Sequence, residues 1–208
     1  RDTLYLEETK KPYSGEVERK YPNGKLLGLA TVKDGKFNGK SYEYYENGKL
    51  KIEENYVNGK SEGVSKVFYP NGKVKYETPY KNDKKEGVEK FYSENGILMS
   101  EIPFKNDVVI GVAKVYNAQT GKLEYEENLV NGKRNGLSKK YYPSGKVLNE
   151  VNFKDDKEEG IMRVYYETGK LQGEIPYKNG QVEGVVKAYD ENGKLIEQAT
   201  FKNGEEVK

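Results

Sequence analysis

The chain has 208 residues, with 36 Lys and Arg against 34 Asp and Glu, which gives a formal net charge of +2. Such a balance lacks the clustered positive charge of nucleic-acid-binding proteins, so no nucleic-acid partner is expected. The chain contains neither cysteine nor histidine. This excludes disulfides, thiolate metal sites and nucleophile–base pairs that need either residue. No apolar run of roughly 18 residues occurs, so no transmembrane segment is predicted.

The composition combines high polarity with many aromatic residues. Charged residues make up 34% of the chain and the mean hydropathy is −0.99, values that on their own favour disorder. However, 19 tyrosines and 6 phenylalanines recur at fixed positions, whereas disordered chains are poor in aromatic residues. We therefore expect a thin, ordered and highly solvated structure.

The first 14 residues precede the regular part of the sequence. Residues 3–6, TLYL, have the composition of a short strand, so residues 1–14 are predicted to form an N-terminal capping strand. A cap of this kind protects the edge of a sheet from pairing with another chain. The chain begins with Arg1 and not with Met, which is consistent with earlier removal of either a signal peptide or a tag.

From residue 15 onward the sequence repeats itself eight times at intervals of 24 residues, with one interval of 25. A glycine opens each unit: Gly15, Gly39, Gly63, Gly87, Gly111, Gly136, Gly160 and Gly184. A second glycine follows in register: Gly24, Gly48, Gly72, Gly96, Gly121, Gly145, Gly169 and Gly193. The predicted units are 15–38, 39–62, 63–86, 87–110, 111–135, 136–159, 160–183 and 184–208. A period of this length marks a repeat array, in which neighbouring units bury their apolar surfaces together.

Each unit has the pattern of one β-hairpin. In the third unit, two runs rich in Val, Tyr and Thr flank Asn71-Gly72, which predicts a two-residue type I′ turn with positive φ at both residues. The fifth unit has one extra residue between Asn117 and Gly121, so a three-residue loop with a glycine bulge is expected there. The predicted fold is therefore all-β: an elongated single antiparallel sheet, a meander of eight 24-residue hairpins.

A two-residue turn also predicts the register of the hairpin. Residues equidistant from Asn71-Gly72 should face each other, which places Lys66 opposite Glu77. The same rule predicts four more pairs of opposite charge: Lys90–Glu101, Lys114–Glu126, Lys139–Glu150 and Arg163–Glu174. Each such pair stabilises a sheet by about 0.2–1 kcal/mol. These charges are therefore interpreted as a structural ladder and not as catalytic acids and bases.

Two classes of position are apolar in every unit, and they are predicted to form the packed face of the sheet. In the third unit these positions are Val74 and Tyr80, and Tyr69 is expected on the same face. The class after the second glycine is Leu26, Leu50, Val74, Leu98, Leu123, Val147, Leu171 and Leu195. The class near the end of the unit is Val32, Tyr56, Tyr80, Phe104, Leu129, Phe153, Tyr177 and Phe201.

The opposite face is predicted to carry the charged ladder and a row of aromatic residues, which we call the aromatic row. Its members are Tyr44, Phe68, Tyr92, Tyr116, Tyr141, Tyr165 and Tyr189. Regularly spaced aromatic side chains can anchor a protein interface or stack against sugars, so this row is the candidate partner-binding site. The alternative is that these residues only cover the sheet and pair with neighbours across the strands.

The repeated unit, G-x-x-K-x-Y-Y-x-N-G-K-L-x-x-E-x-x-Y-K-N-G-K, resembles the MORN-repeat variant of many bacterial proteins, often described as YwqK-type antitoxin components. The resemblance covers residues 13–208 and all eight units. It departs from the original MORN pattern in having no Trp and in turns such as Asn-Asp and Asp-Asp. The resemblance implies an elongated hairpin array used for binding or scaffolding, and it transfers no site residue to this chain.

No pattern in the sequence indicates catalysis, a cofactor or a metal. The phosphate-binding glycine motifs are absent. Asp155-Asp156 occupies the position of Asn-Gly in other units and matches no calcium-binding loop, so it is interpreted as a turn. The adjacent carboxylates Glu53 and Glu54 are expected on opposite faces of the sheet, where they cannot share a substrate. The chain is therefore predicted not to be an enzyme.

The expected function is a non-catalytic scaffold that binds a protein partner, exported from a bacterium or associated with its surface or periplasm. Two alternatives stay open. One is a cytoplasmic antitoxin that neutralises a toxin by direct binding, and the other is a glycan- or cell-wall-binding module that uses the aromatic row.

Overall fold

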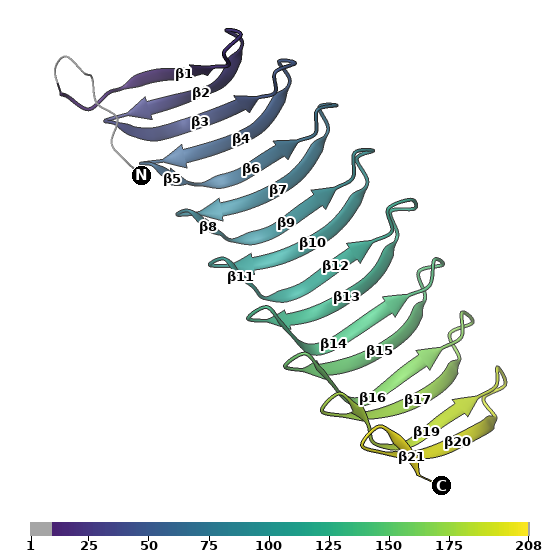
Figure 1. Cartoon of the computed structure of the whole chain (residues 1–208). Helices are drawn as coiled ribbons and strands as arrows, with labels where there is room; N and C mark the ends of the chain where they lie inside the picture. Colours follow the sequence, from purple (N-terminus) through teal and green to yellow (C-terminus); the bar gives the residue numbers. More distant parts are fainter. Residues whose placement is uncertain (1–9, 208) are drawn as a thin grey trace. The chain divides into compact units, whose positions relative to one another are not determined.

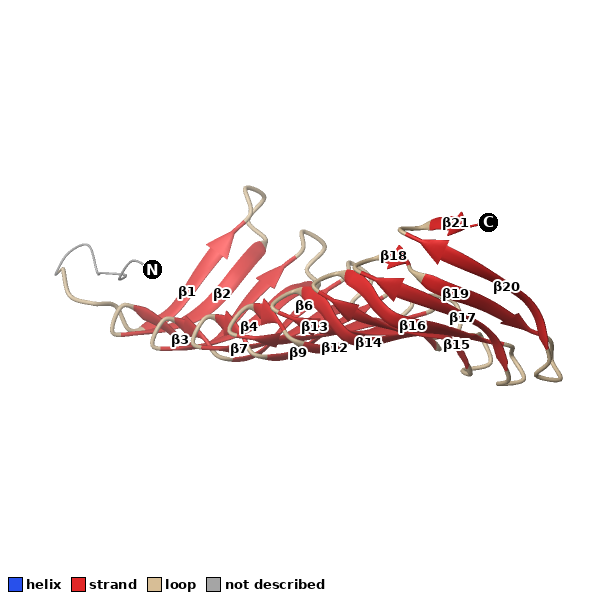
Figure 2. Ribbon diagram, turned by 90° about the horizontal axis from the view of Figure 1, so that it is seen from below, coloured by secondary structure: helices blue, strands red, loops and turns tan. Residues whose placement is uncertain are grey.

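The structure is a computed structural model that describes residues 10–207 (Figure 1). These residues form 21 β-strands joined by turns, and none of them lies in a helix (Figure 2). The predicted all-β array of antiparallel hairpins is confirmed. The strand predicted at residues 3–6, and with it most of the capping segment 1–14, lies outside the described residues.

The chain divides into two compact units, with the boundary between Val108 and Val109. The first unit contains β1 (Gly15–Lys20), β2 (Leu26–Lys33), β3 (Lys36–Tyr44), β4 (Leu50–Val57), β5 (Lys60–Ser61), β6 (Gly63–Phe68), β7 (Val74–Lys81), β8 (Lys84–Lys85), β9 (Gly87–Tyr92) and β10 (Leu98–Lys105). The boundary falls within β11 (Val108–Val109). The second unit contains β12 (Gly111–Tyr116), β13 (Leu123–Val130), β14 (Lys133–Tyr141), β15 (Val147–Lys154), β16 (Lys157–Tyr165), β17 (Leu171–Lys178), β18 (Gln181–Val182), β19 (Gly184–Tyr189), β20 (Leu195–Lys202) and β21 (Glu205–Val207).

Each repeat forms one hairpin of two antiparallel strands. The eight hairpins are β1–β2, β3–β4, β6–β7, β9–β10, β12–β13, β14–β15, β16–β17 and β19–β20. Four repeats have a first strand that is interrupted before the opening glycine, as between β5 and β6, and β21 follows the last hairpin. These additions bring the expected sixteen strands to 21.

The opening glycine marks a break in the pairing between neighbouring hairpins. Where the second repeat leads into the third, Tyr56 of β4 pairs with Ser61, whereas Glu53 of β4 pairs with Lys66, so the register shifts across Gly63. Gly63 has a φ of +82°, in the region that side chains with a Cβ disfavour. The recurrence of glycine at this position therefore follows from the backbone conformation that the break requires.

The loop at Asn71-Gly72 is not the predicted type I′ turn. Gly72 has a φ of +90°, but Asn71 is not among the residues with positive φ. The Gly72 amide donates to the Tyr69 carbonyl, and the Tyr69 amide donates to the Lys73 carbonyl, both at 2.8 Å. These bonds close a three-residue loop that begins at Pro70 and consists of a type I turn followed by a glycine bulge.

The loop of the fifth repeat is one residue longer than predicted. The Asn117 amide donates to the Lys122 carbonyl, and the Gly121 amide donates to the Asn117 carbonyl, both at 2.8 Å. The loop therefore has four residues, 118–121. The expectation of three was wrong because the extra residue is added to a loop that already contains three.

A bulge in the second strand restores the predicted register. Phe68 pairs with Val74, whereas Val67 pairs with Tyr76, so Lys75 is the extra residue of a bulge. The three-residue loop shifts the register by one position and the bulge shifts it back. All five predicted charge pairs are therefore confirmed: Lys66–Glu77, Lys90–Glu101, Lys114–Glu126, Lys139–Glu150 and Arg163–Glu174.

The type I′ turns lie at the other end of the strands, where one repeat leads into the next. Asn82 and Asp83 have φ values of +51° and +70°, and Lys81 pairs with Lys84 across them. Positive φ recurs at the equivalent turns: Asp34-Gly35, Asn58-Gly59, Asn106-Asp107, Asn131-Gly132, Asp155-Asp156, Asn179-Gly180 and Asn203-Gly204. Asn, Asp and Gly occupy these positions because they tolerate the left-handed region better than other residues.

The pairing defines two faces of each hairpin. Directly paired residues of antiparallel strands, and residues two apart along a strand, share a face. Lys66, Glu77, Phe68 and Val74 therefore lie on one face, which we call the ladder face. The opposite face, which we call the core face, carries the buried residues: Ala30, Val32, Tyr56, Ser61, Thr78, Ala113, Val151 and Phe153.

The prediction of the packed face was half right. The class near the end of each unit lies on the core face, where Val32, Tyr56 and Phe153 are buried. The class after the second glycine was assigned to the wrong face, because Val74 pairs with Phe68 on the ladder face. A one-residue bulge between Val74 and the rest of its strand reverses the alternation of side chains, and the sequence pattern contained no signal for it.

Candidate binding surface

The aromatic row occupies one structural position. Each member is the last residue of the first strand of its hairpin, and each side chain is half-buried. The first unit contains Tyr44, Phe68 and Tyr92, and the second unit contains Tyr116, Tyr141, Tyr165 and Tyr189. Within a unit, equivalent residues of neighbouring hairpins are two strands apart, or about 10 Å.

Each aromatic residue of the row faces an aliphatic residue across its own hairpin. The pairs are Tyr44–Leu50, Phe68–Val74, Tyr92–Leu98, Tyr116–Leu123, Tyr141–Val147, Tyr165–Leu171 and Tyr189–Leu195. The sequence interpretation had separated these two classes onto different faces. Together they form a stripe in which aromatic and aliphatic side chains alternate along each unit.

Four tyrosine hydroxyls of the row donate hydrogen bonds within the protein. The Tyr141 hydroxyl donates to Glu126 at 2.7 Å, and the Tyr165 hydroxyl donates to Glu150 at 2.8 Å. The same bond, to a ladder glutamate of the preceding hairpin, occurs at Tyr92–Glu77 and Tyr189–Glu174. Desolvation, together with the hydrogen bond to Glu126, raises the pKa of Tyr141 to about 12.

The ladder glutamates therefore connect neighbouring hairpins. Glu77 lies 3.5 Å from the Lys66 ammonium across its own hairpin and accepts the Tyr92 hydroxyl of the next hairpin at 3.1 Å. Glu174 combines Arg163, at 3.7 Å, with Tyr189 in the same way. Exposed ion pairs of this kind contribute little individually, about 0–1 kcal/mol, so the ladder mainly fixes register and leaves a mixed-charge surface.

A second apolar row on the ladder face was missed by the sequence interpretation. It consists of the residue after the opening glycine, and we call it the valine row: Val64, Val88, Val112, Leu137, Ile161 and Val185. Five of its members are more than two-fifths exposed: Val64 45%, Val88 44%, Val112 42%, Ile161 43% and Val185 41%. The signal was present in the sequence, because this position is apolar in six of the eight repeats.

The valine row lies beside the charged ladder. Val64 is two residues from Lys66 along β6 and pairs with Pro79, so both share the ladder face. In the second unit, Ile161 pairs with Pro176 in the same geometry. The ladder face of each unit thus carries three parallel zones: the aromatic–aliphatic stripe, the Lys–Glu ladder and the exposed valine row.

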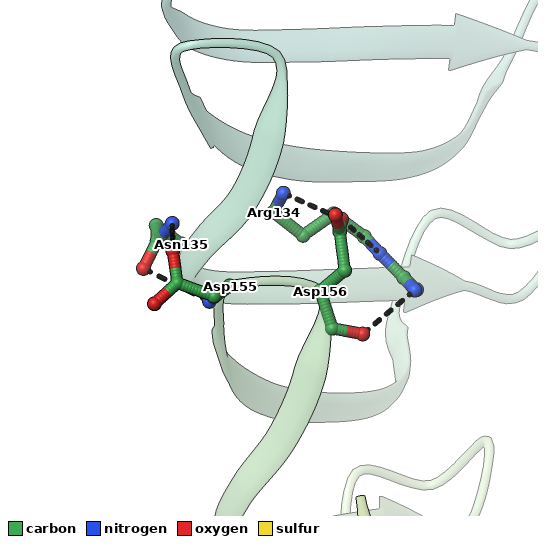
Figure 3. Close-up of polar contacts among 4 residues, drawn as sticks. All are labelled: Arg134, Asn135, Asp155 and Asp156. Carbon is green, nitrogen blue, oxygen red and sulfur yellow. Dashed lines mark hydrogen bonds and ion pairs between the residues drawn. The ribbon is translucent and has the colours of Figure 1, made fainter. Parts of the chain in front are cut away.

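The acidic residues weighed as catalytic or metal-binding candidates have structural partners. Asp155-Asp156 forms a turn, as predicted (Figure 3). The Asp156 carboxylate accepts the Arg134 amide at 2.9 Å, and the Asp156 carbonyl accepts the Arg134 guanidinium at 3.1 Å. Asp155 donates its amide to Asn135 at 3.2 Å. Among residues 10–207, no three acidic residues lie close enough together to hold a metal ion.

Glu53 and Glu54 point to different partners, as their alternation predicted. Glu53 forms an ion pair with Lys40, and Glu54 accepts the Tyr56 hydroxyl at 2.7 Å.

The described part of the chain also contains no helix of the length and apolar character needed to cross a membrane.

Comparison with known proteins supports the repeat architecture. A family model described as MORN repeat variant matches seven segments: 13–34, 37–58, 61–82, 85–106, 134–155, 158–179 and 182–203. The matches leave out residues 107–133, which contain most of the fifth repeat with its longer loop. A search of curated proteins found no match.

Proposed function

This chain belongs to the MORN repeat variant family, and on that premise we propose that it is a non-catalytic scaffold that binds a protein partner through its ladder face. The observation that carries the proposal is the exposed valine row. Aliphatic side chains such as Val64 and Ile161 are more than two-fifths exposed at the same position of successive hairpins. Apolar rows of this regularity, rimmed by polar residues, are typical of interaction surfaces.

The chemistry beside the valine row favours a protein over other ligands. Protein interfaces are enriched in aromatic side chains, and a polar rim surrounds their apolar centre. Both features are present within a few residues of Val64: the half-buried Phe68 and the Lys66–Glu77 pair. Because basic and acidic residues alternate in the ladder, the surface does not supply the positive potential that a nucleic acid requires.

The glycan-binding alternative receives less support. Sugar stacking needs accessible ring faces, whereas the rings of the aromatic row are half-buried and pair with aliphatic residues. The hydroxyls of Tyr92 and Tyr141 also already donate to Glu77 and Glu126. The antitoxin alternative is a special case of protein binding and would be distinguished by the identity of the partner.

The test is site-specific photocrosslinking in the native host. A benzophenone amino acid replaces Val64 in one variant and Ile161 in a second, and Ile196 in a control. Ile196 is 62% exposed but belongs to the bulge of β20, outside the valine row. We expect one protein species crosslinked at 64 and 161 but not at 196. Equal capture at all three positions, or none, would overturn the proposal.

Binding can then be measured with the purified partner. The double variant Val64→Glu and Val88→Glu places charges in the valine row of the first unit and should weaken binding at least tenfold, because it buries unpaired carboxylates in the interface. Ile196→Glu makes the same kind of change outside the row and should leave the affinity unchanged.

We also propose an exported or surface-associated location, with the cytoplasm as the alternative. A composition rich in Lys, Asn and Tyr and free of cysteine supports it. Fractionation of the native host, combined with protease treatment of intact cells, tests the location. Cleavage from outside the cell is expected, and recovery only from the cytosol would favour the antitoxin alternative.

A further inference from the structure

Five repeats contain a tyrosine that fastens one hairpin to the next. This residue directly follows the last residue of the first strand, which is Lys20 in the first repeat and a member of the aromatic row in the other four. Its hydroxyl donates to the backbone carbonyl of the row residue in the next repeat. The bonds are Tyr21 to Tyr44, Tyr45 to Phe68, Tyr69 to Tyr92, Tyr142 to Tyr165 and Tyr166 to Tyr189, at 2.6–2.8 Å. We call these residues latch tyrosines.

The fifth repeat has Asn117 at the latch position. The Asn117 side chain is used within its own repeat: its oxygen accepts the amides of Gln119 at 3.0 Å and Thr120 at 2.9 Å, and its nitrogen donates to Glu124 at 2.7 Å. It is also too short to span the distance that a tyrosine ring covers. The Tyr141 carbonyl, which is equivalent to the carbonyls that accept latch hydroxyls, therefore receives no latch from the fifth repeat.

A hollow of about 540 Å³ lies at this place. Its lining includes Asn117, Leu123, Tyr141, Tyr142, Pro143 and Leu148. The volume falls in the range of roughly 300–1,000 Å³ found for small-ligand pockets. Both Asn117 and Tyr141 border the hollow, so it occupies the space that a latch tyrosine would bridge.

The sequence around the hollow departs from the other repeats in two ways. The loop has one extra residue, and the family pattern does not match residues 107–133. In addition, Leu148 stands where the second and third repeats have Lys51 and Lys75 and where the first, fourth and eighth repeats also have an apolar residue. Those lysines lie over the rings of latch tyrosines, at 5.9 Å for Lys51 and 5.4 Å for Lys75. Leu148 instead gives the hollow an apolar wall.

We propose that this hollow binds a tyrosine side chain presented by the protein partner, with its hydroxyl donating to the Tyr141 carbonyl. The inference rests on the proposed function, and it adds a specific site and the chemistry of its occupant. The five latch tyrosines show what this position of the fold accepts: a phenol ring between two hairpins, with a carbonyl at its end. At the edge of the hollow, Lys140 and Glu124 supply polar groups for the backbone of the incoming peptide.

The first experiment titrates the isotope-labelled full chain with N-acetyltyrosinamide and follows the backbone amides by NMR. We expect saturable shifts confined to residues that line the hollow, among them Asn117, Tyr141 and Leu148. N-Acetylphenylalaninamide lacks the hydroxyl and should bind about fivefold more weakly. Equal affinity for the two probes, or shifts spread over the whole surface, would overturn the proposal, as would binding of free p-cresol without binding of N-acetyltyrosinamide.

Two variants close the hollow by different means. Asn117→Tyr supplies the missing latch, and Leu148→Lys introduces the lysine that the second and third repeats have at this position. Each should abolish the shifts caused by N-acetyltyrosinamide. Ile196→Lys is the matched control, because Ile196 occupies the position of Leu148 in the eighth repeat. The proposal fails if either closing variant folds and still binds the probe as the unchanged chain does.

Crosslinking separates this inference from the proposed function. The crosslinker at position 64 is placed once in a chain with Asn117 and once in a chain with Asn117→Tyr. If both chains capture the partner equally well and bind it with the same affinity, the hollow is not a partner site, although the scaffold function stands. If no partner crosslinks to the unchanged chain, the scaffold function fails, and the probe titration still decides whether the hollow binds a phenol.

Discussion

The third and fifth repeats are built on the same 24-residue plan but connect to their surroundings differently. In the third repeat, the Tyr69 hydroxyl bonds to the next hairpin, Glu62 accepts the amide of Asn82, and Asp83 accepts the amide of Ser61. At the equivalent positions the fifth repeat has Asn117 and Gly132, and Ile110 directly precedes it as Glu62 precedes the third repeat. Three side-chain bonds are thus replaced by an amide used locally, an exposed apolar residue and a glycine.

The difference shows that two sets of residues have separate roles in each repeat. Glycines and apolar positions set the backbone of every hairpin, and charge pairs add to them in five hairpins, including the fifth. The bonds formed by Tyr, Glu and Asp side chains decide how firmly each hairpin holds its turns and its neighbour. A repeat can therefore lose those bonds, keep its fold and gain a surface feature such as the hollow at Asn117.

Removing a latch should have the largest effect. Tyr69→Ala deletes a half-buried ring and its hydrogen bond, so the free energy of unfolding should fall by about 2 kcal/mol in urea denaturation. Tyr69→Phe keeps the ring and should lose about 1 kcal/mol. Asn117→Ala, at the same position of the fifth repeat, should cost about 0.5 kcal/mol. If Tyr69→Ala and Asn117→Ala lowered the free energy of unfolding equally, the stabilising role of the Tyr69 latch would be contradicted.

Adding a latch should have the opposite sign. Asn117→Tyr places a phenol within reach of the Tyr141 carbonyl and should raise the unfolding free energy by about 1 kcal/mol. For a chain of this length, that corresponds to an increase in Tm of about 2–4 °C. Asn117→Phe is the control, because it fills the hollow without the hydroxyl. If both variants gave the same Tm, the hydrogen bond to the carbonyl would not form.

A smaller effect is expected at Ile110. Glu62 and Glu86 accept the turn amides of Asn82 and Asn106, both at 2.9 Å. Ile110→Glu offers the same acceptor to the Asn131 turn and should add about 0.5 kcal/mol. Because Ile110 is 39% exposed, its removal loses little burial. Slower hydrogen exchange of the Asn131 amide would verify the bond, and Ile110→Lys, which has no acceptor, should not slow it.

The last effect appears only at alkaline pH. The pKa of Tyr141 is raised from 10.0 to about 12. The folded state therefore holds the phenolic proton where the unfolded chain releases it, so this group stabilises the fold below pH 10 and loses that contribution as the pH rises toward 12. Urea denaturation at pH 9 and pH 11 should show a smaller decline for Tyr141→Phe than for the unchanged chain. A steeper decline in the variant would refute the assignment.

Much of the fold could be predicted from residue pattern alone. The charge pairs, such as Lys66–Glu77, were right even though the turn between them was assigned incorrectly, because the extra loop residue and the bulge at Lys75 cancel. A proline before Asn-Gly was a signal for the true loop, since Pro70 fits the second position of a type I turn and has no role in a two-residue loop.

The candidate site was less predictable. The aromatic row was located correctly along the strands. Its pairing with Leu50, Val74 and their equivalents depends on a bulge, and no residue type in the sequence predicts that bulge. The use of Tyr hydroxyls as latches could not be predicted either. The partner of Tyr69 is a backbone carbonyl 23 residues away, and every residue offers the same carbonyl.

The sequence by itself determined the period, the hairpins, the turns between repeats and the register of the charge pairs. These features depend on local backbone preference and on residues placed symmetrically about a turn. Only the tertiary structure decided which apolar class lies on which face, which tyrosines fasten neighbouring hairpins and where a hollow remains. A one-residue bulge exchanges the two faces of a strand, and a hollow exists only where one hairpin fails to fill the space that its neighbour leaves.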